Sequence, residues 1–345
     1  MNYLLNNHMQ LKLLENKLLE PSDALISDMA SITGDIMLLG AGGKMGPSMA
    51  KLAKRSIEQA GVRKRVIAVS RFSEDSARRD LQLSGIETIA ADLLDEAALN
   101  ALPDTDNVVY LAGQKFGTTG REPFTWAMNT YLSGRVAERF RDSRIVVFST
   151  GNVYPFARLL EGGLAENHPA EPIGEYGQSC LGRERIFQHF SQQNGTPILI
   201  YRLNYAIDLR YGVLLELAKS VLHSIPIDLS VGHVNVIWQG DANEMAIRSL
   251  LHCTSPATIL NVTGPETISV RWLAHQFGKL FQKEPLFVNE EQPSALLSNA
   301  AEAHKRFGYP RVTLMEMIEM TASWLTLGGE QIDKPTHFQE RKGRF

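Results

Sequence analysis

A run of glycines near residue 40 has the spacing of a phosphate-binding turn. Gly40, Gly43 and Gly46 stand three residues apart, directly after the apolar segment Ile36–Leu39 and before a helical pattern. Glycines in such a turn let the backbone approach a pyrophosphate, which then lies at the N-terminus of the following helix. The segment therefore predicts a dinucleotide site. Its candidate contacts are Gly40, Gly42, Gly43, Lys44, Met45 and Gly46.

The end of the next apolar segment indicates which dinucleotide to expect. Val66–Val69 is followed by Ser70 and Arg71, where an NAD site usually has an acidic residue for the ribose hydroxyls. A guanidinium can instead pair with a 2′-phosphate, and a serine can add a hydrogen bond. Because Lys44 supplies a second positive charge in the glycine turn, the sequence favours NADP(H) over NAD(H).

The elements that must position this turn follow the order of an α/β protein. From residue 35 onwards, short apolar segments rich in β-branched residues alternate with helical patterns. Continuous apolar strands separated by helices are typical of a parallel sheet covered on both faces. We expect a Rossmann-like doubly wound sheet in residues 34–203 and a smaller substrate lobe in residues 204–345. Residues 1–33 are expected to form a helical extension.

Composition argues against several kinds of partner. A net charge of -3 gives no reason to expect nucleic acid or an anionic membrane. The cysteines, Cys180 and Cys253, and the histidines show no metal-ligand spacing, so no metal is expected. Such sparse cysteine usage is typical of a reducing compartment, and we expect a cytoplasmic protein.

The two ends of the chain give weaker signals. Leu11, Leu14 and Leu18 recur at helical spacing and predict an amphipathic helix, which we expect to pack on the main domain or on another subunit. The basic C-terminal segment Arg341–Arg344 is expected to be a solvated end.

A second set of motifs, combined with the glycine turn, makes the chain similar to a known family. Residues 148–154 read Phe-Ser-Thr-Gly-Asn-Val-Tyr, and Tyr176 begins a later helical pattern. In this order the motifs resemble those of the extended short-chain dehydrogenase/reductase family, the group of sugar-nucleotide epimerases and dehydratases, over about residues 35–328. The resemblance implies adenine contacts at Asp92 and Leu93, a cofactor turn at Leu111, Ala112 and Gly113, an active-site support at Asn129, and a passage to the substrate lobe at Asn204.

The same resemblance implies catalytic roles and reveals a departure. In that family a tyrosine moves a proton at the substrate oxygen, a serine or threonine polarises that oxygen, and a lysine four residues after the tyrosine holds the ribose and lowers the tyrosine's pKa. By position Tyr176 and Thr150 take the first two roles, with Ser149 as a neighbour that could substitute. Cys180 occupies the lysine position, although a neutral thiol is only a weak donor. Without a nearby charge, a phenol with a pKa of about 10 is a poor base.

Three hypotheses follow from the missing lysine. Tyr176 could act only as an acid, as carbonyl reduction requires. Alternatively, Lys115, which follows an apolar strand pattern by four residues, could supply the charge or simply be a surface loop residue. The third hypothesis is a catalytically silent NADP(H)-binding sensor or scaffold. Cys180 as a nucleophile is disfavoured because no histidine is placed by sequence to activate it.

The predicted function is therefore a nicotinamide-dependent oxidoreductase or epimerase/dehydratase acting on a carbohydrate-type hydroxyl or carbonyl. The substrate could be a sugar, a sugar acid or a sugar nucleotide. The resemblance also implies a homodimer formed through the helices near residues 124–140 and 176–193. Candidate substrate contacts are Thr118, Thr119, Arg121, Trp126, Asn152, Asn204 and Arg210.

Overall fold

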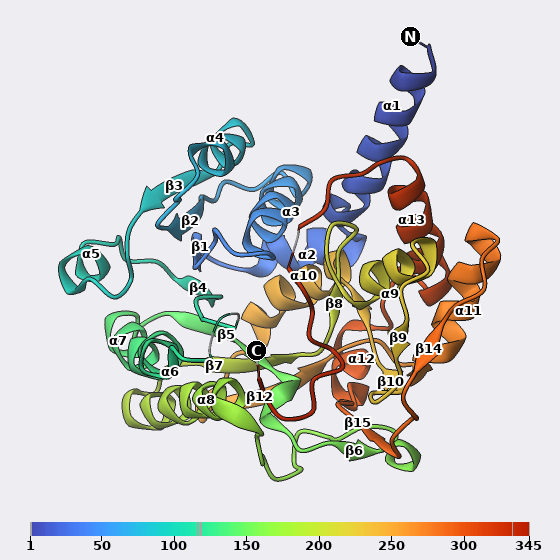
Figure 1. Cartoon of the computed structure of the whole chain (residues 1–345). Helices are drawn as coiled ribbons and strands as arrows, with labels where there is room; N and C mark the ends of the chain where they lie inside the picture. Colours follow the sequence, from blue (N-terminus) through green and yellow to red (C-terminus); the bar gives the residue numbers. More distant parts are fainter. Residues whose placement is uncertain (1, 116, 118, 333, 345) are drawn as a thin grey trace.

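The computed structural model describes residues 2–115, 117, 119–332 and 334–344, and its centre is a seven-stranded parallel sheet. The strand order is β12-β7-β5-β4-β1-β2-β3, so the direction of winding reverses between β1 and β4 (Figure 1). This order confirms the predicted doubly wound fold. The strands are β1 (Ile36–Leu39), β2 (Val66–Ser70), β3 (Glu87–Ala90), β4 (Asn107–Tyr110), β5 (Arg144–Thr150), β7 (Ile198–Leu203) and β12 (Thr258–Val262).

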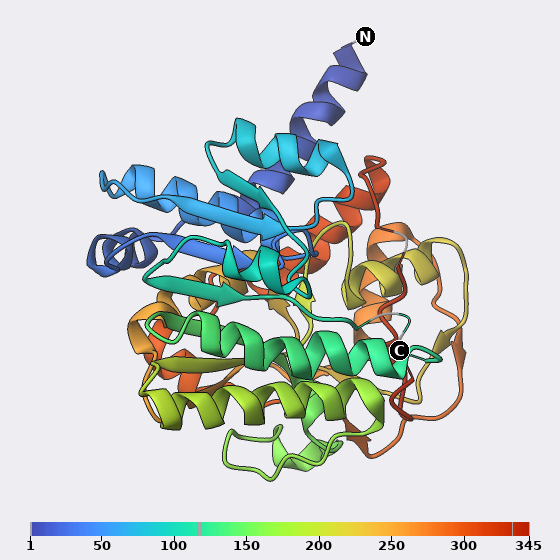
Figure 2. The same ribbon diagram turned by 90° about the vertical axis from the view of Figure 1, so that its left-hand side faces the viewer.

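Helices cover both faces of the sheet, because each strand near its centre is apolar on both sides. Figure 2 shows blue helices on one side of the strands and green helices on the other. The first layer contains α2 (Asp23–Ser31), α3 (Gly46–Gln59), α4 (Asp75–Leu83), α10 (Gln239–Arg248) and α12 (Ala301–Phe307). The second contains α5 (Glu96–Asn100), α7 (Leu132–Arg139) and α8 (Gly174–Asn194).

A further apolar cluster lies beside the sheet. It joins α9 (Val213–Leu222), α11 (Val270–Phe281) and α13 (Leu314–Thr326) with short paired strands. β12 follows the proposed boundary at residue 204 and still pairs with β7, so the central sheet draws on both proposed domains. The short pairs are β8 (Ala206–Ile207) with β11 (Ile237–Trp238), β9 (Ile227–Asp228) with β14 (Phe287–Val288), β10 (His233–Val234) with β13 (Ile268–Ser269), and β6 (Ala157–Arg158) with β15 (Ser294–Ala295).

The N-terminal extension packs on the rest of the chain through its second half. α1 (Asn2–Asn16) projects from the body with the N-terminus at its far end (Figure 1), whereas Leu18 behind it is buried. Ser22 caps α2 by accepting a hydrogen bond from the Leu25 amide at 3.0 Å. An ion pair of 2.6 Å between Arg248 and Asp28 ties α10 to α2. No helix in the described part of the chain is long and apolar enough to cross a membrane.

The prediction of a solvated C-terminal end is wrong for Arg341, whereas Lys342 and Arg344 are exposed. Phe338 is only 1% exposed, and Arg341 donates a hydrogen bond of 2.7 Å to the Ser294 carbonyl. Its guanidinium also lies over the Phe156 ring, 4.2 Å from the centroid. The segment has no helical or strand periodicity, so composition alone suggested a free end.

Candidate active site

The glycine turn between β1 and α3 is packed tightly at both ends and open at Gly43. A Cβ on Gly40, whose φ is +89°, would lie 2.6 Å from the Ala112 amide nitrogen, and one on Gly46 would lie 2.2 Å from the Ala41 carbonyl oxygen. A Cβ on Gly43 would have its nearest neighbour at 3.5 Å, an ordinary van der Waals contact. These are the features of a turn that leaves room for a pyrophosphate at a helix N-terminus, so the residues present fit a dinucleotide.

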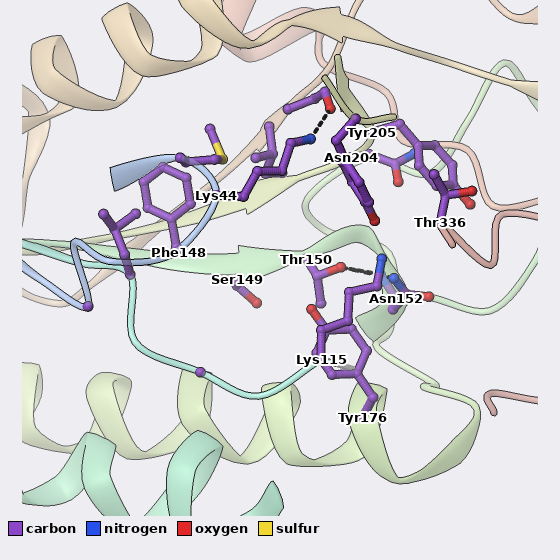
Figure 3. Close-up of a pocket in the computed structure, with 18 of the residues that line it drawn as sticks. Lys44, Lys115, Phe148, Ser149, Thr150, Asn152, Tyr176, Asn204, Tyr205 and Thr336 are labelled. Carbon is purple, nitrogen blue, oxygen red and sulfur yellow. Dashed lines mark hydrogen bonds between the residues drawn. The ribbon is translucent and has the colours of Figure 1, made fainter. Parts of the chain in front are cut away.

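A pocket of about 280 Å³, here called the inner pocket, opens at the carboxyl ends of β1, β4, β5 and β7 (Figure 3). Ligands of open α/β sheets bind at this edge, where the strand order reverses. Phe148 lies at one end of this pocket and Thr336 at the other (Figure 3). Its polar lining residues are Lys44, Gln114, Lys115, Ser149, Thr150, Asn152, Tyr176, Arg183, Asn204, Tyr205, Tyr211 and Thr336.

Tyr176 and Thr150 meet inside this pocket. Tyr176 lies in the first turn of α8, Thr150 ends β5, and their hydroxyl groups are hydrogen-bonded. The backbone amide and the side chain of Asn152 donate to the Thr150 hydroxyl at 3.1 and 3.0 Å, which fixes its orientation. Burial raises the pKa of Tyr176 well above its ordinary value, so the phenol is protonated at neutral pH.

Ser149 faces a different partner. Its hydroxyl donates to the Glu184 carboxylate at 2.5 Å, and Glu184 in turn forms a buried ion pair of 2.6 Å with Arg202. These groups link β5, α8 and β7. A serine engaged with a buried carboxylate has little freedom to polarise a substrate, so Thr150 remains the candidate for that role.

We expect Thr150→Val to lower turnover by about 10²–10³-fold, because it removes a hydrogen-bond donor aimed at the reacting oxygen. Ser149→Ala is the matched control, since it removes a hydroxyl from the adjacent position. It is expected to leave turnover within a few-fold and to lower the free energy of unfolding by about 1–3 kcal/mol, because Glu184 loses a partner. Steady-state kinetics and denaturant unfolding measure both effects. The reverse ranking in turnover would assign the role to Ser149.

Cys180 takes the lysine position without replacing the lysine. It is 1% exposed, it does not line the inner pocket, and its side chain is hydrogen-bonded to Tyr176. Burial raises the pKa of the thiol, which is therefore neutral. Cys180 is thus a packing residue behind the tyrosine and cannot contact a cofactor ribose in the way that the resemblance implied.

Arg183 supplies a cation near this point that the sequence prediction missed. Its guanidinium donates to the Phe148 carbonyl at 2.7 Å and to the Asn129 side-chain oxygen at 2.9 Å. It lies close to Gly113, where a Cβ would stand 2.4 Å from a guanidinium nitrogen. Arg183 follows Tyr176 by seven residues, which is two helical turns, so the shared helix face was a usable signal.

Asn129 fixes the loop that carries Lys115. It lies in a π-helical turn (Ala127–Tyr131), a feature often found at functional sites. Its side chain accepts from the Gln114 amide at 2.8 Å and donates to the Gln114 carbonyl at 3.0 Å, so it grips the backbone next to Lys115. The predicted supporting role of Asn129 therefore has a physical basis, but the residue does not line the pocket itself.

Lys115 lies in the inner pocket beside Tyr176. Its ammonium nitrogen is 6.0 Å from the centroid of the Tyr176 ring, and Figure 3 shows the two side chains next to one another. Burial lowers the pKa of Lys115 to about 8, while Cys180 acts in the opposite direction. Lys115 is therefore mostly charged at neutral pH and is not a surface loop residue.

Lys44 lies on the opposite wall, which contradicts its predicted place beside Arg71. Its nitrogen donates to the Ala206 carbonyl at 2.9 Å and lies 4.1 Å from the centroid of the Tyr211 ring (Figure 3). Ala206 follows β7, and Arg71 follows β2 on the other side of the sheet centre. Burial lowers the pKa of Lys44 to about 7, Asp208 raises it, and Lys115 and Arg210 lower it further.

The other predicted cofactor residues lie at the expected edge of the sheet. Ser70 touches the glycine turn, because a Cβ on Gly42 would stand 2.4 Å from its hydroxyl. Arg71 is exposed and forms no hydrogen bond or ion pair with a described residue. Asp92 accepts from the Leu94 amide at 3.0 Å and is exposed, whereas Leu93 is buried.

The predicted substrate residues divide into two groups. Asn152 and Asn204 line the inner pocket. Thr119, Arg121, Trp126 and Arg210 do not: the first two are exposed, Trp126 donates to Glu175 at 2.5 Å, and Arg210 forms an ion pair with Asp208 at 3.0 Å. Thr118 lies outside the described residues.

Tyr211 and Thr336 are pocket residues that the sequence prediction missed. Tyr211 follows the predicted residue Arg210 directly. In the structure Tyr211 lines the pocket, whereas Arg210 pairs with Asp208. Thr336 comes from a segment with no recognisable pattern, so no signal could have identified it. Within the described part of the chain, no group of acidic, histidine or cysteine residues could hold a metal ion.

The fold and the glycine turn define this chain as a Rossmann-type α/β protein with a nucleotide-binding edge. Residues 36–207 match the sequence profile of the NAD dependent epimerase/dehydratase family. No curated protein matches the sequence.

Solved structures of similar fold include proteins in complex with NAD and UDP-sugars. MoeE5 in complex with UDP-glucose and NAD is 17% identical with a TM-score of 0.68, and the overlap covers 85% of this chain and 99% of that one. UDP-glucuronic acid 4-epimerase from Bacillus cereus with NAD is 18% identical with a TM-score of 0.70, covering 85% and 98%. UDP-glucose 4-epimerase from Thermus thermophilus with NAD is 19% identical with a TM-score of 0.67, covering 84% and 97%. Because the sequence identities are below 20%, these structures show a shared fold only.

Proposed function

We propose that the protein is a nicotinamide-dependent oxidoreductase or epimerase that acts on a hydroxyl or carbonyl of a carbohydrate. One observation carries the proposal: Tyr176, Thr150 and Lys115 converge in a single pocket directly beside the open glycine turn. The family match of residues 36–207 and the sugar-nucleotide enzymes among the structural neighbours support it.

Each side chain has a definite task in this proposal. The nicotinamide, when bound, supplies or accepts the hydride. Thr150, oriented by Asn152, donates a hydrogen bond to the substrate oxygen. Tyr176 gives a proton to that oxygen during carbonyl reduction and takes it back during alcohol oxidation.

Arg183 and Lys115 share the electrostatic part of the missing lysine's task. A cation near an acid favours its ionised form, and the Arg183 guanidinium lowers the pKa of Tyr176 against the larger effect of burial. The Lys115 ammonium, 6.0 Å from the centroid of the Tyr176 ring, adds a second cation on the pocket side. Asn129 holds the loop in place, and Arg183 holds Asn129. Lys115 is thus fixed beside the phenol from a loop, whereas the family's lysine lies on the tyrosine's own helix.

We propose NADP(H) as the preferred cofactor, on the basis of Arg71 and Ser70 alone, since Lys44 is engaged elsewhere. Arg71→Ala is expected to weaken NADP(H) binding by about tenfold or more and NAD(H) binding only slightly, because it removes a charge-assisted contact to the 2′-phosphate. Isothermal titration with both cofactors measures the ratio. Arg79→Ala is the control, since Arg79 is also an exposed arginine near β2. Equal losses for both cofactors, or comparable affinities in the wild type, would contradict the preference.

A turnover screen tests the proposed function. The purified protein is incubated with NADP(H) or NAD(H) and a set of sugars, sugar acids and sugar nucleotides, and the absorbance of reduced nicotinamide is followed. A parallel chromatographic assay detects epimers, which form without net change in the cofactor. Turnover of one carbohydrate is the expected result. Cofactor binding without any turnover would favour the silent sensor or scaffold.

For the assembly we propose a homodimer through α7 and α8. These two helices lie side by side on one face of the sheet, and Tyr131 in the π-helical turn before α7 is 62% exposed. Sedimentation of the wild type and of Tyr131→Glu would reveal such an interface as a loss of the dimer in the variant.

A further inference from the structure

The C-terminal segment, residues 334–344, contributes to the wall of the inner pocket. In Figure 1 it is the red chain that leaves α13 and crosses the body towards the label C. Thr336 in this segment is one of the residues lining the inner pocket. The segment is therefore part of the site and is more than a chain end.

Four anchors hold this segment to different elements. The Thr336 amide and hydroxyl donate to Glu216 of α9 at 3.0 and 2.5 Å. Phe338 packs in the apolar cluster of α9, α11 and α13. Arg341 donates to the Ser294 carbonyl at 2.7 Å, and Gly343 lies so close to Gly174 that a Cβ on Gly174 would stand 2.3 Å from its carbonyl oxygen. Gly174 begins α8, two residues before Tyr176.

A second cavity adjoins the inner pocket on this side. It has a volume of about 320 Å³, is here called the outer pocket, and lies between α9 and residues 332 and 334–336. Three residues line both cavities and so form the partition between them: Tyr211, Gly212 and Thr336. Of these, Thr336 belongs to the C-terminal segment.

The direction in which a long substrate would extend is fixed by the chemistry. The reacting carbon must lie between Tyr176 and the glycine turn, since the proton donor and the cofactor approach it from those sides. Any further substituent must then point away from the glycine turn, towards Thr336 (Figure 3). In this direction it meets the partition and the C-terminal segment.

The volumes limit what the inner pocket can hold. Pockets for drug-sized ligands measure about 300–1,000 Å³. The inner pocket has about 280 Å³, part of which belongs to the nicotinamide. This space suits a monosaccharide, whereas a sugar nucleotide would need the outer pocket as well.

From this arrangement we propose that the C-terminal segment determines substrate size and restricts the enzyme to a carbohydrate without an attached nucleotide. The proposal rests on the proposed function, because it concerns the substrate of that same site. It separates this chain from the structural neighbours solved with UDP-sugars, whose fold it shares.

Binding of UDP-glucose to three proteins tests the proposal. The first is the wild type, the second ends at Glu330 and lacks the segment, and the third is Phe338→Ala/Arg341→Ala, which loosens it without shortening the chain. We expect both variants to bind UDP-glucose at least about tenfold more tightly than the wild type in isothermal titration. The double variant keeps the test decisive if the shortened chain does not fold.

Matched controls separate this outcome from other failures. Lys342→Ala/Arg344→Ala removes two exposed cations of the same segment and is expected to behave like the wild type. Equal UDP-glucose affinity of wild type and variants would overturn the proposal, and so would UDP-glucose binding to none of them. Titration of NADP(H) into the same samples tests the proposed function separately. If none of the proteins bound NADP(H), the proposed function would be refuted. The comparison of UDP-glucose affinities would still show whether the C-terminal segment limits substrate size.

Discussion

Replacement of Tyr176 by Phe is expected to lower turnover by about 10²–10⁴-fold, the usual contribution of a positioned proton donor. The variant removes one oxygen from the pocket. Thr150 keeps its two hydrogen bonds from Asn152, so the end of β5 should stay in place. Cofactor affinity is expected to remain within a few-fold, because the ring still packs against the same neighbours.

Steady-state kinetics, cofactor titration and thermal unfolding of the same samples distinguish a chemical role from a structural one. Tyr131→Phe is the control, because it removes the hydroxyl of an exposed tyrosine outside the pocket. If Tyr176→Phe retained near-normal turnover, the proton would have to come from another group, and the assigned site would be wrong.

Replacement of Lys115 by Met is expected to lower turnover by more than about a hundredfold while cofactor binding is kept. Met preserves most of the volume and removes the charge beside Tyr176. Lys115→Arg should recover part of the activity, because it restores a cation at the end of a similar stem. If Lys115 only stabilised the loop, Lys115→Met and Lys115→Arg would have similar effects on turnover.

The pH profile gives a second readout of Lys115. Burial lowers its pKa to about 8, so the ammonium is charged below that pH and loses its proton above it. If the charge is needed, carbonyl reduction should decline as the pH rises through about 8, and the decline should be absent from the residual activity of Lys115→Met. Lys12→Met, at an exposed position of α1, should behave like the wild type. Near-normal turnover of Lys115→Met would end the catalytic assignment.

Sequence reasoning was most successful where a local pattern determines the structure. Two glycines of the turn, Gly40 and Gly46, stand where the packing leaves no room for a Cβ, and the strands of the sheet follow from short apolar, β-branched segments. The predicted helix at residues 176–193 is α8, and Tyr176 and Thr150 meet because α8 packs against β5.

It was least successful where a long side chain had a choice of direction. Lys44 lies in a correctly predicted turn, but its four-carbon stem reaches Ala206 and Tyr211, since the carbonyl and the aromatic ring both attract an ammonium there. Arg210 turned back to Asp208, two residues before it, whereas the neighbouring Tyr211 faces the pocket. Such choices depend on tertiary contacts that residue spacing does not encode.

The C-terminal segment shows a different limit. Its anchors are single residues, Thr336, Phe338 and Arg341, each held by an element far away in the sequence. Neither helical nor strand periodicity accompanies them, so the sequence suggested a free end. Irregular segments that complete a pocket can be recognised only once the partner surfaces are in place.

The silent alternative also makes a distinct prediction for the site. A protein that only senses its cofactor would need the glycine turn and the ribose contacts, but it would not need the Thr150–Tyr176 hydrogen bond or a fixed Lys115. In this chain Asn152, Asn129 and Arg183 all orient those side chains or the loop that carries one of them. Because these hydrogen bonds orient the side chains that catalysis would need, we favour an enzyme over a silent sensor.

Identification of the nucleotide that the purified protein releases on denaturation tests the central claim most directly. Mass spectrometry of the supernatant, with and without prior incubation with NADP(H) or NAD(H), reads the cofactor without any knowledge of the substrate. We expect NADP(H), in equal amounts from the wild type and Lys115→Met. Release of NAD(H) would refute the Arg71 assignment and favour an epimerase that recycles its cofactor. If the protein released no nucleotide and bound neither cofactor, the proposal that it is a nicotinamide-dependent enzyme would be refuted.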